Sequence, residues 1–380
     1  MTKSNTTSPF DLPVLPPQLD YLVLVPDLAR AHAAIARLDE TLTHLRNPRL
    51  IERTFLTREA VLSSQIEGTQ ATLEEVLREE AEAGEDVSEA TKKLQDIREV
   101  LNYRRAMQEG VRMVDKDQPL AENGVKRLHA ILLQSVRGKT RAPGEFRRNQ
   151  VYIAPPGTPM SDARYVPPPP MRVPDLYSNF DRYFNADDAE RDPLVQIAVA
   201  HYQFEAIHPF SDGNGRVGRL LIPLFLYQRK LLSKPYVYVS KYFEEHRRDY
   251  YDLLADVSYK GAWTPWLRFF LNGLTEQAAD AATLAHRILD MQREYHSALV
   301  SFKSPYALNL LDTLFAYPIM TTTQMRRLGD IPNTQTLLNL VKKFVKVGIL
   351  KDVSPTRQRN KTYVFQPLLD LLDGYDDAKG

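Results

Sequence analysis

The sequence predicts a mainly α-helical protein that carries a small β-hairpin and ends in a small α+β domain. Long stretches repeat apolar residues at three- and four-residue spacing, which is the pattern of an amphipathic helix. A segment between Gly138 and Pro170 combines short β-like runs with turn-forming residues, and the composition changes again after about Val300. At 380 residues the chain exceeds the size that one hydrophobic core usually serves, so we expect two or three domains.

The overall composition is that of an ordinary globular protein. Hydrophobic residues make up 43% and aromatic residues 9%, and the net charge of +1 gives no global preference for nucleic acid or membranes. The chain has no cysteine, which excludes disulfides and thiolate metal sites and is compatible with a reducing cytoplasm. Because no stretch resembles a signal peptide or a membrane span, we expect a cytoplasmic protein without a membrane partner.

The first part of the chain is predicted to be an extended arm followed by helices. Residues 1–27 form the arm, because the first twenty include four prolines and little periodic pattern. Residues 28–110 form an N-terminal helical region that opens with the periodic stretch DLARAHAAIARLDETLTHL. Pro48 is expected to start a second helix, and Gly68 to end it. The acidic stretch that follows is typical of a solvated helix and loop.

Residues 111–300 are predicted to form a helical core that is interrupted by the hairpin. The hairpin covers residues 147–166, where FRRNQVYIA and ARYVPPPP flank the turn-rich connector PPGTPMSD. The prolines that follow return the chain in an extended conformation. Helices resume with PDLYSNFDRYFN and DPLVQIAVAHYQFEAI, and a buried apolar helix is expected to begin near Gly215 or Arg216.

The stretch HPFSDGNGRVGR, residues 208–219, lies between two apolar helices and combines features that suit a phosphate ligand. Gly213 and Gly215 flank Asn214, and glycines let the backbone approach a ligand closely. Successive N–H groups in such a loop form an anion-binding concavity. The helix that begins there adds unpaired N–H donors and the positive end of its dipole. We therefore expect an anion site at this helix start.

Charged and titratable side chains complete the same stretch. Arg216 and Arg219 share one helix face, and guanidinium groups match phosphate oxygens. Asp212 is a candidate Mg²⁺ ligand, since Mg²⁺ is commonly held by one or two carboxylates plus substrate phosphates. His208 is a candidate base near neutral pH. Each feature alone would be more typical of a cap, a turn or a surface ion pair, but their convergence favours a site for a polyphosphate and a metal.

The stretch resembles the Fic family signature H-x-F-x-[DE]-G-N-G-R-x-x-R, with every specified position filled. The helical surroundings from about Leu28 to Leu274 are also similar to that family's all-helical core. The resemblance implies a protein adenylyltransferase, which transfers AMP from ATP to a Ser, Thr or Tyr hydroxyl of a target protein and releases pyrophosphate. A lysine in place of Gly215 would indicate the family's phosphotransferase branch, so the glycine favours nucleotidyl transfer.

The resemblance also assigns expected roles within the stretch. His208 would activate the target hydroxyl, Phe210 would anchor the loop and Asp212 would hold Mg²⁺. The glycine-rich turn and Arg216 would bind the α- and β-phosphates, and Arg219 would orient the γ-phosphate. The residues expected to contact the nucleotide are Gly213, Asn214, Gly215, Arg216, Val217, Gly218, Arg219, Tyr250 and Tyr251.

The two tyrosines of this set lie in YFEEHRRDYYDLL, where the family's adenine pocket usually has aromatic residues. Family members commonly have an asparagine some eight residues after the first of these, where this chain has Ser258. That departure leaves the contact to the base open. The alternative is that Tyr250 and Tyr251 are ordinary core residues of a helix.

The predicted hairpin resembles the β-hairpin flap that Fic proteins carry beside the phosphate loop. Its exposed edge, at Val151, Tyr152, Ile153 and Ala154, would bind an extended segment of the target protein through main-chain hydrogen bonds. Such binding would place a hydroxyl near His208 without requiring a target sequence. The alternative is an ordinary solvent-facing hairpin.

The stretch SSQIEG, residues 63–68, resembles the family's inhibitory motif [ST]-x-x-x-E-[GN]. Ser63 and Glu67 share one helix face, and Gly68 is placed to end the helix. The resemblance implies that Glu67 pairs with Arg219 and occupies the cation needed for the γ-phosphate, so that the enzyme is autoinhibited. Release of the brake would expose self-modification, and the same glutamate is suited to position a water that removes AMP. The sequence does not determine which direction dominates.

Residues 301–380 are predicted to form a separate basic domain. Residues 303–367 hold ten Lys or Arg and three acids, an excess of about seven positive charges. The order helix, turn, helix and two strands around the loop SPTRQRN resembles a winged-helix domain, with Thr321 to Thr323 able to cap the first helix. Such domains often bind DNA, although they also mediate protein contacts. The alternative function is therefore a nucleotide-sensing, DNA-binding transcriptional regulator, and the sequence is compatible with a homodimer without determining the oligomeric state.

Overall fold

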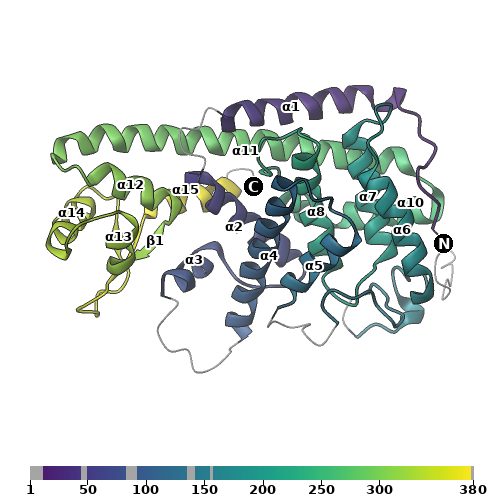
Figure 1. Ribbon diagram of the computed structural model, residues 1–380, viewed down its shortest axis with the longest axis horizontal. Helices are drawn as coiled ribbons and strands as arrows, with labels where there is room; N and C mark the ends of the chain where they lie inside the picture. The colour runs from purple at the N-terminus through teal and green to yellow at the C-terminus, as the bar shows by residue number, and fades with distance from the viewer. Residues whose placement is uncertain (1–11, 44–48, 83–91, 135–141, 155–156, 378–380) are drawn as a thin grey trace. The chain divides into compact units, whose positions relative to one another are not determined.

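The computed structural model of the chain describes residues 12–43, 49–82, 92–134, 142–154 and 157–377. Helices dominate these residues and a single small sheet accompanies them, which confirms the mainly α class (Figure 1). Residues 1–11 of the predicted arm and the expected helix start at Pro48 lie outside the described residues, and residues 22–27, which were expected in the extended arm, are helical. Within the described ranges, no helix is both long and apolar enough to cross a membrane.

The chain divides into two compact units that do not follow its linear order. Unit 1 comprises Met1–Asp39, Leu62–Gly68 and Asn102–Ala279, and unit 2 comprises Glu40–Val61, Thr69–Leu101 and Asp280–Gly380. The segment SSQIEG therefore belongs to the same unit as the stretch 208–219. Several helices contribute residues to both units, namely α1 (Val25–Thr43), α2 (Arg49–Ile66), α4 (Lys92–Asp115) and α11 (Trp263–Leu299). The domain boundaries expected from composition remain predictions.

Unit 1 is built around α7 (Pro193–Ile207), which packs against α6 (Val173–Asn185) and α8 (Asn214–Gln228). α7 is apolar around almost its whole circumference, so burial on all sides is the stable arrangement for it. The carboxylate of Asp192 caps the start of α7 by accepting a hydrogen bond from the Leu194 N–H at 2.8 Å. The other elements of unit 1 are η1 (Leu22–Leu24), α5 (Glu122–Leu132), η2 (Met160–Asp162), η3 (Pro170–Arg172), α9 (Ser240–Glu245) and α10 (Arg247–Lys260).

The predicted hairpin differs from the structure in the extent of its pairing. Its arms are joined by a single antiparallel bridge between Ile153 and Tyr165, in place of a ladder of two strands. The Ile153 N–H donates to the Tyr165 carbonyl, and the Arg164 N–H donates to the Ile153 carbonyl, each at 2.9 Å. Prolines occupy 155, 156, 159 and 167–170, and because proline has no N–H donor the ladder cannot extend in either direction.

Unit 2 contains a three-stranded antiparallel sheet in the order β1 (Ile319–Thr321), β3 (Thr362–Val364) and β2 (Lys351–Asp352). Met320 pairs with Tyr363, and Lys351 pairs with Val364 on the other side of the same strand. α3 (Leu73–Glu82) packs against β1. The remaining elements of unit 2 are η4 (Val300–Phe302), α12 (Ala307–Ala316), α13 (Thr322–Leu328), α14 (Thr334–Lys346) and α15 (Gln366–Asp377).

The elements of the basic segment follow the predicted order of two helices and two strands. Thr321 caps α13 through a capping box in which its hydroxyl accepts from the Gln324 N–H at 3.3 Å and its own N–H donates to the Gln324 side chain at 2.9 Å. Strand β1 was not predicted, because three residues are too few to show a β period. It places the cap at the edge of the sheet.

Candidate active site

His208 ends α7 with a left-handed backbone (φ +50°), a conformation that a non-glycine residue adopts only where its surroundings hold it. Its backbone N–H donates to the Phe204 carbonyl at 3.0 Å, and its Nδ1 lies 3.3 Å from the Glu205 carbonyl. That contact assigns the proton to Nδ1 and leaves the lone pair on Nε2. Burial lowers the pKa of His208 to about 4, although the Glu205 carbonyl opposes the shift. The imidazole is therefore an uncharged base at neutral pH.

The turn that follows is closed by the side chain of Asn214. Its Oδ1 accepts from the Phe210 N–H and its Nδ2 donates to the Phe210 carbonyl, both at 2.8 Å. Phe210 is fully buried, and its ring stacks on His129 with a centroid distance of 3.8 Å. Asn214 therefore shapes the loop with its side chain, and only its backbone can face an anion.

Two residues that sequence reasoning missed fix the loop from outside. The Nδ1 of His129 accepts from the Gly144 N–H at 2.8 Å, so its Nε2 donates to the Asp212 carbonyl at 2.9 Å. Arg147 donates from Nε to the His208 carbonyl at 2.8 Å and from Nη2 to the Pro168 carbonyl at 2.5 Å. Burial lowers the pKa of His129 to about 4, so this imidazole is also uncharged. The sequence gives no local signal for either residue, because both contacts join distant parts of the chain.

Gly213 and the first turn of α8 have the backbone geometry that the expected anion cradle requires. Gly213 has φ +78°, a conformation that favours glycine, and α8 begins at the next residue. The first N–H groups of a helix have no intrahelical partner, so those of α8 can bind an anion. The Arg216 side chain is buried, with Nη2 at 3.5 Å from Oδ1 of Asp212. Val217 and Gly218, also expected to bind nucleotide, are buried as well, and the Val217 N–H already donates to the Gly213 carbonyl at 3.0 Å.

The side chain of Arg219 is held by both polar residues of the segment SSQIEG. Its Nε donates to Oγ of Ser63 at 2.9 Å, and its Nη2 donates to the Ser63 carbonyl and to Oε1 of Glu67, each at 2.8 Å. Arg219 is only 2% exposed, whereas the Glu67 side chain is 36% exposed. Burial alone would raise the pKa of Glu67, but the Arg219 guanidinium outweighs it and lowers that pKa below the ordinary value. The structure thus brings Ser63, Glu67 and Arg219 together.

The carboxylate of Glu67 also lies directly against the anion cradle. A Cβ placed on Gly215 would be 2.3 Å from Oε1 of Glu67 and 2.8 Å from Nη1 of Arg219. Any side chain at this position would therefore displace the carboxylate or the guanidinium. Gly68, with φ +92°, follows at once and ends the segment.

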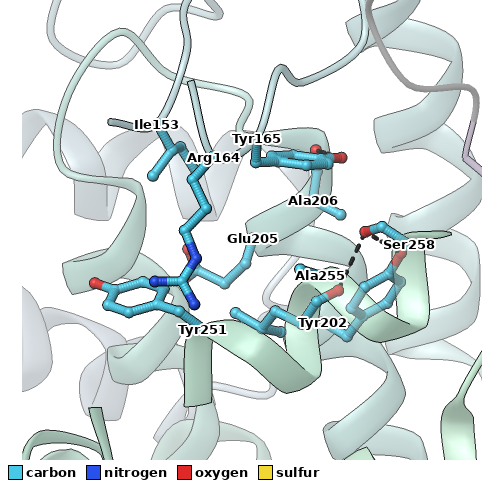
Figure 2. A pocket seen from close by; sticks show the side chains of 10 residues that line it. Ile153, Arg164, Tyr165, Tyr202, Glu205, Ala206, Tyr251, Ala255 and Ser258 are labelled. Carbon is cyan, nitrogen blue, oxygen red and sulfur yellow. Dashed lines mark hydrogen bonds between the residues drawn. The ribbon is translucent and has the colours of Figure 1, made fainter. Parts of the chain in front are cut away.

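A pocket opens beside the cradle, between the predicted flap, α7 and α10 (Figure 2). Together with its open mouth it holds about 450 Å³ of empty space. The flap and α7 contribute Ile153, Arg164, Tyr165, Tyr202, Glu205 and Ala206, and α10 contributes Tyr251, Leu254, Ala255 and Ser258.

The two expected adenine-pocket tyrosines are separated by the structure. Tyr251 lines the pocket, and the guanidinium of Arg164 lies 5.3 Å from its ring centroid. Tyr250 is instead buried, with its hydroxyl 2.9 Å from Nε2 of His201, and it does not line the pocket. Consecutive helical residues point about 100° apart, so only one of the pair can face the pocket. Ser258 also lines it, with Oγ 2.9 Å from the Tyr202 hydroxyl.

The flap edge that is expected to dock a target has some backbone groups open for hydrogen bonds. Ile153 directs both its N–H and its carbonyl into the bridge, so the backbone groups of its neighbours Tyr152 and Ala154 face the opposite edge. Tyr152 is exposed, and Val151, Ile153 and Ala154 are half-buried. The carbonyl of Val151 accepts from the Gln150 side chain at 3.0 Å.

Two family models match the chain over the regions that build this site. Residues 25–112 match the Fic/DOC family N-terminal region, and residues 119–226 match the Fic/DOC family domain, which together cover more than half of the 380 residues. The chain belongs to the Fic/DOC family. The N-terminal match contains the segment SSQIEG, and the Fic domain match contains the whole stretch 208–219.

Known relatives agree with this assignment. A protein adenylyltransferase Fic from Culex quinquefasciatus is 38% identical over 138 residues, which are 36% of this chain and 24% of that protein. The chain thus spans about a quarter of the length of the relatives it matches. A Fic family protein from Desulfovibrio desulfuricans G20 has the same fold, with a TM-score of 0.59, 22% identity and coverage of 92% of this chain and 98% of that one. Fic-1 from C. elegans gives a TM-score of 0.51 at 21% identity, over 71% of this chain and 74% of that one.

The one candidate metal ligand that the sequence pointed to is Asp212. Asp212 is 39% exposed and lies next to the first turn of α8. Among the residues that the structure describes, no group of three or more His, Asp or Glu side chains could hold a metal by itself. A metal here would need oxygen ligands from a bound substrate, which is how Mg²⁺ is commonly held.

Proposed function

We propose that this Fic protein is an autoinhibited protein adenylyltransferase. ATP and a hydroxyl of a target protein are its substrates, and AMP transfer is its reaction. The observation that carries the proposal is the contact of Glu67 with Arg219, beside an anion cradle and an uncharged histidine. The adenylyltransferase name of relatives that match 36% of the chain supports the same reaction.

The proposed step needs one base and a neutralised polyphosphate. Nε2 of His208 removes the proton from the target hydroxyl, whose oxygen forms a bond to the α-phosphorus of ATP. The bond between that phosphorus and the oxygen bridging to the β-phosphate breaks, and pyrophosphate leaves. The N–H groups at the start of α8 and the guanidinium of Arg216 stabilise the charge on the phosphates. Most of the catalysis is therefore positioning and charge neutralisation.

Asp212 is the residue that would hold Mg²⁺. Its carboxylate is partly exposed and stands at the edge of the cradle, which suits an ion shared with substrate phosphates. When bound, Mg²⁺ would neutralise charge on the leaving pyrophosphate. The carbonyl of Asp212 is fixed by His129, so the orientation of the loop does not depend on the ion.

In this proposal Glu67 inhibits the enzyme by occupying Arg219. The Nε and Nη2 donors of the guanidinium bind Ser63 and Glu67, so they cannot bind a γ-phosphate in the same geometry. The Glu67 carboxylate would also repel that phosphate, since it lies against Gly215. Only part of its side chain is covered, so a partner or a shift of α2 can withdraw it. The same carboxylate is placed to orient a water for removal of AMP.

Transfer of label from ATP tests this proposal. With ATP labelled at the α-phosphate, Glu67→Gly should label itself or a lysate protein more strongly than the wild type. The double variant Glu67→Gly/His208→Ala should lose that label by a factor of ~10²–10⁴, the usual contribution of a general base. ATP labelled at the γ-phosphate is the control and should leave no label on protein. Label from the γ-position, or label that persists without His208, contradicts adenylylation.

A second candidate function is DNA binding by the basic segment of unit 2. α14 buries Leu337, Leu340 and Phe344 and exposes Asn339, Lys342 and Lys346 on the other face. Amide and cationic side chains on one exposed helix face suit base edges and phosphates in a major groove. The charge excess of the same segment favours a phosphate partner.

Salt-dependent binding to duplex DNA tests the second function. Lys342→Ala/Lys346→Ala in the full chain should weaken binding and reduce the slope of log affinity against log salt by about two. The matched control, Lys116→Ala/Lys260→Ala, removes two exposed lysines of unit 1 and should leave the slope unchanged. Equal slopes in all three proteins would rule out DNA contact by α14.

A further inference from the structure

The C-terminal end of α2 carries Glu67 to the cradle, so the contacts that hold this end also set the position of the carboxylate. The last four carbonyl groups of a helix have no partner within the helix and need donors from elsewhere. In α2, two of the four accept from the N–H groups of Glu67 and Gly68, which turn back along the chain at 3.0 and 2.9 Å. The other two accept from arginine side chains of different helices.

These two arginines are Arg219 of α8 and Arg247, the first residue of α10. Arg219 donates to the Ser63 carbonyl at 2.8 Å, and Nη2 of Arg247 donates to the Ile66 carbonyl at 3.0 Å, both within unit 1. α2 has no basic residue in its own last turn. A cation is stabilising near the C-terminal end of a helix, because that end carries partial negative charge. Arg247 therefore gives the end of α2 both a hydrogen bond and a favourable charge.

The two arginines differ in whether a bound nucleotide would claim them. Arg219 is 2% exposed, and in the proposed function it is the group that binds the γ-phosphate. Arg247 lies outside the stretch 208–219, and its side chain is half exposed, with Nη1 at 3.7 Å from Oε1 of Glu244. Arg247 can thus keep its bond to α2 while Arg219 exchanges Glu67 for phosphate. It is the contact that would return Glu67 to Arg219 after the exchange.

Arg247 also lies beside the wall of the pocket in Figure 2. Tyr251, which lines that pocket, is four residues further along α10 and therefore on the same helix face. Burial and the charge of Glu67 raise the pKa of Tyr251, whereas Arg219 and Arg247 oppose the rise, so these four side chains lie near one another. The hydrogen bond of Arg247, however, goes to α2 and not to a group of the pocket.

We propose that Arg247 is a positioning residue of the inhibitory contact, which holds the Glu67 carboxylate on Arg219 by binding the end of α2. The inference rests on the proposed function, in which the docked carboxylate keeps the enzyme inactive. Without Arg247 the end of α2 would be withdrawn for a larger fraction of the time, and the rate of AMP transfer would rise with that fraction. Since Arg247 acts through Glu67, its loss should have little effect once Glu67 is absent.

Initial rates of transfer from α-labelled ATP by the full chain test this role in two backgrounds. Arg247→Ala should raise the rate about three- to tenfold, which corresponds to the loss of one hydrogen bond. Arg247→Lys should stay nearer the wild type, because an ammonium group can still donate to the Ile66 carbonyl. In the Glu67→Gly background, Arg247→Ala should change the rate less than about twofold. A merely structural role would lower the rate in both backgrounds.

Arg248→Ala is the matched control for these rates. Arg248 is the next residue of α10, its side chain is 92% exposed, and its Nε lies 3.7 Å from Oδ2 of Asp252. Its removal takes the same charge from the same helix turn without touching α2, so the rate should equal that of the wild type.

Hydrogen exchange gives a second readout that does not depend on activity. The N–H groups of Glu67 and Gly68 bond within the end of α2, and they should exchange faster in Arg247→Ala than in the wild type or Arg248→Ala. Circular dichroism of each variant checks the fold. Equal exchange in the three proteins would show that Arg247 does not hold this end of α2.

The outcomes separate this inference from the proposed function. A rate that is unchanged or lower in Arg247→Ala, or that rises equally in both backgrounds, overturns the role of Arg247 and leaves the adenylyltransferase proposal standing. If Glu67→Gly is no faster than the wild type, inhibition by Glu67 is refuted, and the inference with it. A rise that needs Glu67, together with faster exchange at Glu67 and Gly68, supports the assignment.

Discussion

The phosphate loop and the flap differ in how firmly they are held, although both border the same site. The loop is bonded from every side, because Asn214 closes it, Phe210 anchors it, and His129 and Arg147 fix its carbonyl groups. The two arms of the flap share one backbone bridge, between Ile153 and Tyr165, and its side chains Arg164 and Tyr165 also bond to α10 and α7. Preorganisation is needed where charge develops in a transition state, whereas a target-binding edge must accept different chains. We therefore expect the loop to serve the chemistry and the flap to serve target docking.

The largest effect on activity is expected from a variant that removes the hydrogen bonds closing the phosphate loop. Asn214→Ala removes both hydrogen bonds to Phe210 and leaves a buried N–H and carbonyl without partners, at a cost of about 2 kcal/mol or more. In the Glu67→Gly background, AMP transfer should fall ~10–100-fold, and thermal unfolding should shift to lower temperature. Asn185→Ala is the matched control, since it removes two hydrogen bonds to Asp181 on α6. If the two variants lose activity equally, the loop is not specially preorganised.

A smaller effect is expected from the flap, and it should depend on the backbone more than on the side chain. Tyr152→Ala keeps the N–H and should change the KM for a protein target less than threefold. Tyr152→Pro removes that N–H from the open edge and should raise the KM about tenfold without changing kcat. Steady-state kinetics with one fixed target protein distinguish them. A larger effect of alanine than of proline would show that the target is read through the tyrosine ring.

The smallest change in activity is expected when the pH is lowered moderately. Because burial lowers the pKa of His208 to about 4, its base form persists well below the ordinary histidine range near 6.5. The protonated form is inactive, so activity is lost only as the pH falls through about 4. The kcat/KM of Glu67→Gly should therefore be nearly flat from pH 7.5 to 5.5, with circular dichroism confirming the fold. An inflection between pH 6 and 7 would show that the working histidine is solvated.

The sequence predicted the parts of this site that are linear motifs. The convergence of Ser63, Glu67 and Arg219 followed from two short patterns whose positions on helix faces are set by the helical period. His129 and Arg147 could not be predicted, because each acts through contacts between segments that only the fold brings together. The choice between Tyr250 and Tyr251 needed the rotation of α10, which a short periodic pattern does not define. The hairpin ladder was overestimated, because its prolines remove the donors that a second bridge would require.

We propose that the site is complete and that Glu67 restrains it through Arg219. The most direct measurement is the initial rate of AMP transfer from α-labelled ATP by wild type, Glu67→Gly and the control Glu74→Gly, whose side chain pairs with Arg78 on α3. We expect a rate at least tenfold higher for Glu67→Gly than for the other two proteins, which should be alike. Equal rates for wild type and Glu67→Gly, with both proteins folded, would contradict it.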